Sequence, residues 1–454
     1  MNRIIVASWL CGCVAVMGVE SSGTKVDTVK LLTLDPGHFH AALVQKVMVP
    51  GVDPLVHVYA PAGPDLDLHM QKIQGYNTRA ENPTRWESKL YTGPDYLARL
   101  VSERAGNVVV LAGNNARKTR YIGDCVKAGF NVLSDKPMAI TPQDFELLKQ
   151  AFRVAKEKGV LLYDIMTERN EVTSILQKEL SHSPALFGEL EQGTPTDPAV
   201  TKESVHHYFK YVSGKPLQRP PWFFDSAQQG DAIVDVTTHL VDLVQWECFP
   251  EQVLSPQDVK VLSARRWTTP VTQAQFTKAT SMVAYPDYLK KYADAQGGLN
   301  VDGNGEFTYT IKGIHAKVSV RWNFEAPEGA GDTHYSLMRG TKAALIIRQG
   351  AEQAYKPTLY VEPRGGQSVD SLKPALDAAL ARVCKAWPGV TAKKTDTAWE
   401  IVIPAEFKVG HEAHFAQVMG KYLKYLSLRA LPSWEEPNML VKYYTIMQAY
   451  QMAK

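Results

Sequence analysis

A carboxylate and an imidazole stand four residues apart in the segment 230–246. The apolar residues of this segment recur at helical spacing, so Asp235 and His239 are expected on one helix face, with Asp242 close to it. An imidazole beside a carboxylate is suited to taking up a proton near neutral pH. The spacing therefore predicts an acid–base pair, and an ordinary contact on a helix surface is the simpler alternative.

A lysine follows a short apolar run and precedes a proline in the segment 129–137. The run 129–133 is typical of a buried parallel strand, and open α/β sheets bind their ligands at the carboxyl ends of such strands. Lys136 is therefore predicted to lie at a ligand site. Pro137 restricts the backbone of Lys136 to extended geometry and is also compatible with a cis peptide bond.

The elements that must position these residues alternate between strand-like and helix-like segments from Val29 onward. This pattern predicts an α/β fold that begins with a Rossmann-type, doubly wound sheet of six strands over residues 25–165. The strands that stand out in this domain are 29–34, 55–60, 108–112, 131–133 and 160–163.

The pattern changes in the second part of the chain, residues 166–454. Polar and apolar residues alternate there as they do in antiparallel strands, which predicts an α+β domain with a largely antiparallel sheet. Strands are expected at 308–314, 315–324 and 343–349, turns at 303–305 and 312–313, and helical structure at 412–452.

The loop after the first strand matches a dinucleotide-binding fingerprint poorly. Gly37 is the one glycine of the G-x-G-x-x-G pattern that remains, and it is the one that lets the backbone approach a pyrophosphate. Asp35 places a negative charge where a phosphate would lie, and His40 is bulky where helix and strand should meet. His38 and His40 either bind phosphate or substrate, or fill space. The carboxylate that would bind a ribose hydroxyl after Ala60 is missing.

Taken together, these segments resemble the Gfo/Idh/MocA family, which includes glucose-fructose oxidoreductase and inositol dehydrogenase. The segment 109–115 is similar to the family's strand that ends in Thr-Pro-Asn, and 134–137 is similar to its Glu-Lys-Pro motif, with Asp135 in place of Glu. The segment 230–246 is similar to its Gly-Gly-x-x-x-Asp-x-x-x-His-x-x-Asp stretch. The resemblance covers about residues 28–250 and fades after that.

The resemblance implies NAD or NADP as cofactor and a carbohydrate as substrate. It also implies that Lys136 and His239 transfer protons at the reacting hydroxyl, while Asp235 orients the substrate or His239. For the aromatic Trp222, packing is the simpler alternative to sugar binding. Residues expected at the cofactor are Gly37, His38, Phe39, Asn114, Asn115 and Lys136, and those expected at the substrate are Glu168, Arg169, His207, Trp222 and Asp242.

Composition and charge favour a small-molecule ligand. The 454 residues carry 50 Lys and Arg against 47 Asp and Glu, without a basic block, which argues against a nucleic-acid partner. Three cysteines lie beyond residues 1–22, and their wide spacing suggests neither a disulfide framework nor a metal site. They are Cys125, Cys248 and Cys384, and no metal is predicted.

Residues 1–22 have the pattern of a secretory signal, which predicts export, with the protein either periplasmic or anchored by lipid. The apolar stretch is too short for a membrane span, but Leu10–Cys13 resembles a lipobox that would make Cys13 a lipid anchor.

The expected function is that of an exported, NAD(P)-linked oxidoreductase acting on a hydroxyl of a sugar, glycoside or cyclitol, in a homo-oligomer. Free dinucleotide is scarce outside the cytoplasm, so export favours a tightly bound cofactor and a redox-neutral cycle. One alternative is a cofactor-independent lyase or hydrolase whose catalytic residues are Lys136, Asp235 and His239. The other is a non-catalytic sugar-binding lipoprotein.

Overall fold

The computed structural model describes residues 28–212, 214–328 and 330–453. The predicted signal segment 1–22 and the lipid-anchor candidate Cys13 lie outside the described residues. Among the helices of the described part, none combines the length and apolar character needed to cross a membrane.

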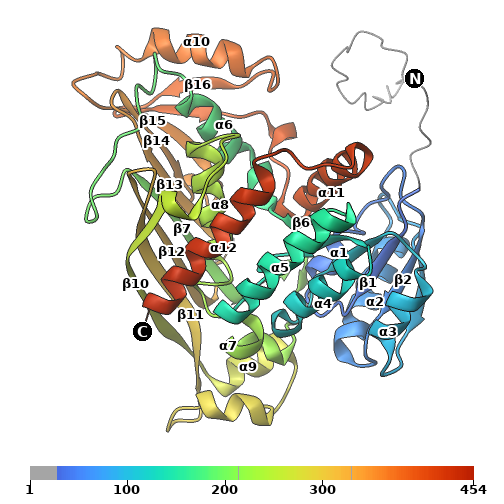
Figure 1. Cartoon of the computed structure of the whole chain (residues 1–454). Coiled ribbons are helices and arrows are strands. Elements are labelled where there is room, and N and C mark those ends of the chain that lie inside the picture. Colours follow the sequence, from blue (N-terminus) through green and yellow to red (C-terminus); the bar gives the residue numbers. More distant parts are fainter. Residues whose placement is uncertain (1–27, 213, 329, 454) are drawn as a thin grey trace, which may run out of the picture.

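The first domain contains a parallel sheet of six strands in the order β3-β2-β1-β4-β5-β6, with helices on both faces (Figure 1). The central strands β1 and β4 are buried at every position, as their unbroken apolar runs require. The predicted doubly wound sheet is confirmed. Its elements are β1 Leu31–Leu34, α1 His40–Leu43, β2 Leu55–Tyr59, α2 Pro64–Thr78, β3 Glu87–Tyr91, α3 Tyr96–Glu103, β4 Val108–Leu111, α4 Asn115–Lys127, β5 Asn131–Asp135, α5 Pro142–Lys158 and β6 Leu162–Ile165.

One of the six strands, β3, has no clear signal in the sequence. It reads Glu-Ser-Lys-Leu-Tyr, lies at the edge of the sheet, and leaves Glu87, Lys89 and Leu90 exposed. An edge strand that faces solvent lacks the apolar run by which the buried strands can be recognised.

The second domain contains a nine-stranded sheet in the order β10-β11-β12-β7-β13-β14-β15-β17-β16. Every neighbouring pair is antiparallel except β12 and β7, which confirms the largely antiparallel sheet. Its strands, with the small β8–β9 pair, are β7 Val200–Phe209, β8 Tyr211–Val212, β9 Lys215–Pro216, β10 Val259–Val271, β11 Leu299–Ile311, β12 Ile314–Glu325, β13 Thr333–Arg339, β14 Ala343–Arg348, β15 Thr358–Pro363, β16 Thr391–Lys394 and β17 Trp399–Val402.

Helices α6 and α8 lie against one face of this sheet (Figure 1). The helices of the second part are η1 Thr167–Asn170, α6 Val172–Ser181, η2 Pro221–Phe224, α7 Ser226–Gln229, α8 Thr237–Cys248, η3 Pro256–Asp258, α9 Gln273–Thr280, η4 Asp287–Tyr292, η5 Ala351–Gln353, α10 Lys373–Val383, η6 Ala405–Phe407, α11 His411–Leu428 and α12 Glu435–Met452.

Two predicted turns have different outcomes. Lys312 and Gly313 form a tight turn between β11 and β12, with φ of 48° and 83°, as predicted. The turn expected at 303–305 is wrong, because these residues lie inside β11. A Cβ at Gly303 would meet the Tyr208 hydroxyl, so this glycine serves close packing and not a change of chain direction.

The C-terminal helices tie the two sheets together. The helical tail predicted at 412–452 consists of α11 and α12, separated at Arg429, whose φ is 53°. Helix α12 packs on α8 and β10 of the second domain and also on α5 of the first, and α11 contacts α1 and β6 (Figure 1). The C-terminal helices therefore contact elements of both domains.

Candidate active site

A cavity of about 1430 Å³ lies where the strand ends of the first sheet meet the second sheet and α11. It is lined by residues from all three, among them Phe39 and Asn115 of the first domain. Seven of the chain's 12 histidines line it, which is an unusual concentration of groups that can transfer protons or bind metals. They are His38, His40, His206, His239, His334, His411 and His414.

Lys136 and Asp235 meet in this cavity although 99 residues separate them. The Lys136 ammonium donates to Asp235 Oδ1 at 2.6 Å, and Gln229 donates to the other carboxylate oxygen at 3.0 Å. The Lys136–Pro137 peptide is cis. Asp235 lies in the turn that leads into α8. Within the described part of the chain, its carboxylate binds Lys136 and Gln229 and not the predicted partner His239.

His239 occupies the first turn of α8 and lines the same cavity. Burial, with a second contribution from the Lys136 ammonium, lowers the pKa of His239 to about 3. Its Nδ1 has no hydrogen-bond partner among the described residues. The imidazole is therefore neutral near pH 7, and a buried nitrogen is available to a ligand.

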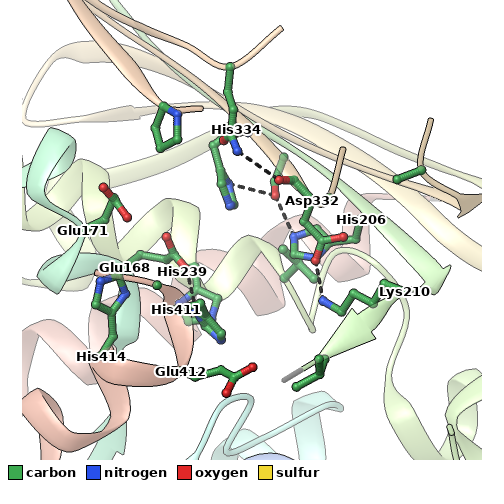
Figure 2. A pocket seen from close by; sticks show the side chains of 18 of the residues that line it. Glu168, Glu171, His206, Lys210, His239, Asp332, His334, His411, Glu412 and His414 are labelled. Carbon is green, nitrogen blue, oxygen red and sulfur yellow. Dashed lines mark hydrogen bonds and ion pairs between the residues drawn. The ribbon is translucent and has the colours of Figure 1, made fainter. Parts of the chain in front are cut away.

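Glu168 lies beside His239 and His411 in the cavity (Figure 2). Burial raises the pKa of Glu168, but the neighbouring histidines, above all His411, hold it well below its usual range. The atoms Glu168 Oε1 and His411 Nδ1 are 3.6 Å apart. His411 begins α11, far from the predicted motifs, and its role at the cavity could not be recognised from its local sequence.

A second polar group lines the opposite side of the cavity (Figure 2). Ser204 Oγ lies 2.6 Å from His206 Nε2 and 3.1 Å from His334 Nδ1. His206 Nδ1 lies 3.1 Å from Asp332 Oδ2, and Lys210 also pairs with this carboxylate. This arrangement offers several donors and acceptors to a hydroxyl-rich ligand.

Arg169 and Asp242, which were predicted to contact substrate, do not line the cavity. They form a buried ion network instead, because each finds its charge partner across an interface between elements. Arg169 binds Asp242 at 2.6 and 2.7 Å and Glu435 at 2.9 Å. Lys442 binds Asp164 at 2.6 Å and Asp242 at 3.0 Å.

This network positions the site residues that lie next to it. Glu168 precedes Arg169 in η1, and His239 lies one helical turn before Asp242 in α8. Buried charges thus join η1 and α8, the elements that carry Glu168 and His239, to each other and to α12. The expectation that Arg169 and Asp242 contact substrate is not met by their position, which is in this ion network.

His207 and Trp222 are also absent from the cavity lining. His207 is buried behind the second polar group, where its Nδ1 lies 3.1 Å from Asp332 Oδ1. The Trp222 indole donates to Asp65 Oδ2 at 2.7 Å and packs over Gly37. Trp222 thus contributes to packing at the domain interface, the simpler of the two roles considered for it.

The predicted nucleotide loop is covered in this structure. A Cβ at Gly37 would lie 2.7 Å from Asp65 Oδ2 and 3.0 Å from Trp222 Cζ2. The Gly37 amide already donates to the Asp35 carbonyl at 3.0 Å, and the His38 amide donates to the Ala112 carbonyl at 3.0 Å. Amides with these partners are not free to bind a pyrophosphate.

The asparagines after β4 bind the neighbouring domain. Asn114 donates to Gln228 at 2.8 Å, and Asn115 donates to the Gln229 carbonyl at 2.7 Å. Asn115, Phe39 and Lys136 line the cavity, whereas Gly37 and Asn114 do not. Four of the predicted cofactor residues therefore line the cavity, and two do not. The four are His38, Phe39, Asn115 and Lys136.

Known proteins support the class that the fold and site indicate. Residues 176–454 match the family model described as "Putative oxidoreductase C terminal domain". A structure described as a "putative oxidoreductase" from Parabacteroides merdae ATCC 43184 is 54% identical, with a TM-score of 0.91, and the match covers 94% of this chain and 98% of that one. The chain matches no curated protein.

More distant structures share the fold. A 3-ketoreductase from Actinomadura kijaniata, solved with NADP, is 12% identical with a TM-score of 0.55, and the match covers 94% of this chain and 98% of that one. Levoglucosan dehydrogenase, solved with NADH and levoglucosan, is 12% identical with a TM-score of 0.56. This match also covers 94% of this chain and 98% of that one.

The two sheets, their order and the placement of the cavity define a protein of Gfo/Idh/MocA type, and the predicted resemblance is confirmed. The chain belongs to the oxidoreductase family whose C-terminal domain model it matches over 176–454.

Proposed function

We propose that the protein is an NAD(P)-linked oxidoreductase that acts on a carbohydrate hydroxyl in the cavity between its domains. The observation that carries the proposal is the convergence of Lys136, Asp235 and His239, from distant parts of the chain, on one polar cavity. The nucleotides and the sugar named with the distant structures support the class of cofactor and substrate.

The chain's own residues account for the proton transfer. Oxidation of a hydroxyl requires removal of its proton, and His239 is a neutral imidazole in the cavity whose buried Nδ1 has no hydrogen-bond partner among the described residues, so its ring can receive that proton. The Lys136 ammonium, held at 2.6 Å by Asp235, would stabilise negative charge that develops on the same oxygen. The cofactor, when bound, supplies the hydride acceptor, with Phe39, Asn115 and Lys136 as the cavity residues that would hold it.

The covered Gly37 loop favours a second candidate, a cofactor-independent lyase or hydrolase that uses the same three residues. The two candidates differ in one measurable property, which is the binding of a dinucleotide. Full-length protein is mixed with NAD+ or NADP+ and examined by native mass spectrometry, and sugars are then tested for turnover. Bound nucleotide and reduced nicotinamide support the oxidoreductase; sugar turnover without any bound nucleotide contradicts it and supports the second candidate.

Trp222→Ala is expected to tighten NAD(P) binding about fivefold or more. The wild-type protein must break the Trp222–Asp65 hydrogen bond, worth roughly 1 kcal/mol, before a pyrophosphate can approach Gly37. Isothermal titration calorimetry of the two proteins gives the ratio of dissociation constants. Trp267→Ala, a change of the same kind on the half-exposed strand β10, is the control. Weaker binding by Trp222→Ala would show that the indole holds the nucleotide and does not exclude it.

We also propose that the protein is exported and forms a homo-oligomer. If nucleotide binds, export favours a cofactor that stays bound through a redox-neutral cycle. Fractionation of cells that express the full chain, followed by light scattering of the purified protein, tests both points. Retention in the cytoplasm would remove the reason for a redox-neutral cycle.

A further inference from the structure

Two histidines of the loop after β1 meet an aspartate from the end of β5 at one point of the cavity. His38 and His40 follow β1, and Asp135 ends β5, 95 residues beyond His40. Asp135 Oδ2 lies 3.0 Å from His40 Nδ1 and 3.5 Å from His38 Nδ1. The ligating atoms of the three side chains all lie within 4.8 Å of one another.

The separations of 3.0 and 3.5 Å between Asp135 Oδ2 and the two imidazole nitrogens suit ligands of a single metal ion. Imidazole nitrogens and carboxylate oxygens bind transition metals at about 2.0–2.2 Å, so ligands of one ion are about 3–4 Å apart. Two histidines and one carboxylate form a ligand set that borderline divalent metals accept. All three residues line the cavity, so further coordination positions would face bound water or substrate.

The protonation state of the two histidines is compatible with metal binding. Burial lowers the pKa of His38 and of His40 well below the usual value, so both imidazoles are neutral near pH 7. Neutral imidazole is the form that binds metals. The ion-pair contacts of Asp135 among the described residues are with these two histidines.

The nearby lysines are engaged elsewhere. The Lys136 ammonium binds Asp235, and the buried Lys118 ammonium binds the Asp135 carbonyl and the Asn115 side chain. Asp135 is 3% exposed, so its carboxyl group is removed from water without a lysine or arginine contact in the described part of the chain. A bound cation would supply that partner.

We propose that His38, His40 and Asp135 bind one divalent transition-metal ion of the zinc, cobalt or manganese class, which coordinates an oxygen of the substrate. The ion would lie in the cavity that contains Lys136 and His239, and it would polarise a hydroxyl or carbonyl oxygen that those residues serve. The site goes beyond the proposed function and does not depend on whether a dinucleotide binds.

The test uses full-length, untagged protein freed of metal with a chelator, in the absence of sugar and nucleotide. Zinc and cobalt are titrated by calorimetry, and the cobalt complex is followed by its visible absorbance. We expect one equivalent of metal in the wild-type protein and a loss of affinity of at least about a hundredfold in His40→Ala and in Asp135→Asn. His38→Gln provides a third variant if either of these fails to fold, as judged by circular dichroism.

The control is His315→Ala, because His315 lies outside the cavity and contacts the Gln192 carbonyl. It should bind metal as the wild type does. The proposal is overturned if the wild-type protein binds no metal, or if the ligand variants bind it with unchanged affinity. Since no turnover is measured, neither result depends on the oxidoreductase assignment.

Discussion

Lys136→Met and His239→Gln are each expected to lower kcat/KM for the carbohydrate substrate by at least about a hundredfold. Lys136 brings a positive charge to the cavity, and His239 brings the neutral imidazole. Under the proposed function, removal of either takes away a group that acts on the reacting oxygen. Steady-state kinetics with the purified variants measure the effect.

The double variant distinguishes a shared role from two separate ones. If Lys136 and His239 act on the same oxygen, the double variant should lose little more than the worse single variant, because groups that act as a unit are not additive. Lys158→Met, a change at the exposed end of α5, is the control for loss of a lysine. Single variants with the turnover of the wild type would contradict the assignment.

Lys442→Met is expected to lower the free energy of unfolding by about 3–5 kcal/mol. The Lys442 ammonium is fully buried between Asp164 and Asp242, and its removal leaves two carboxylates without this charge in the interior. Urea unfolding followed by circular dichroism gives the difference. Lys290→Met is the matched control: its contact with Asp287 is exposed, so the loss should be at most about 1 kcal/mol.

The same substitution has a second expected effect, on the site. Because the network joins α12 to α8 and η1, its loss should also reduce turnover in protein that remains folded. A Lys442→Met protein as stable as the control would show that the network adds little to the junction of the domains.

The local sequence was sufficient for the parts of the fold that depend on local patterns. Buried strands such as Val108–Leu111 are unbroken apolar runs, and the alternation around the turn at Lys312 marks an antiparallel hairpin. The exposed edge strand β3 lacks such a run, so its local sequence does not predict it. The sequence cannot distinguish a turn glycine from one such as Gly303, which is required because the Tyr208 side chain packs against it.

A residue of the candidate site can be predicted from the sequence only when a local motif marks its position. Lys136 at a strand end and His239 in a helix face were located by local spacing, and both line the cavity. Asp242 shares that helix, but the sequence does not reveal that Arg169 and Lys442 pack against it. His411 reaches the cavity only because the C-terminal helices return to the first domain.

The most direct measurement is a crystal structure of the protein with a bound carbohydrate substrate. We expect a sugar oxygen within about 2.6–3.2 Å of both the Lys136 ammonium and a nitrogen of His239. A sugar that occupies the cavity in a productive complex but contacts neither side chain would contradict catalysis by these residues.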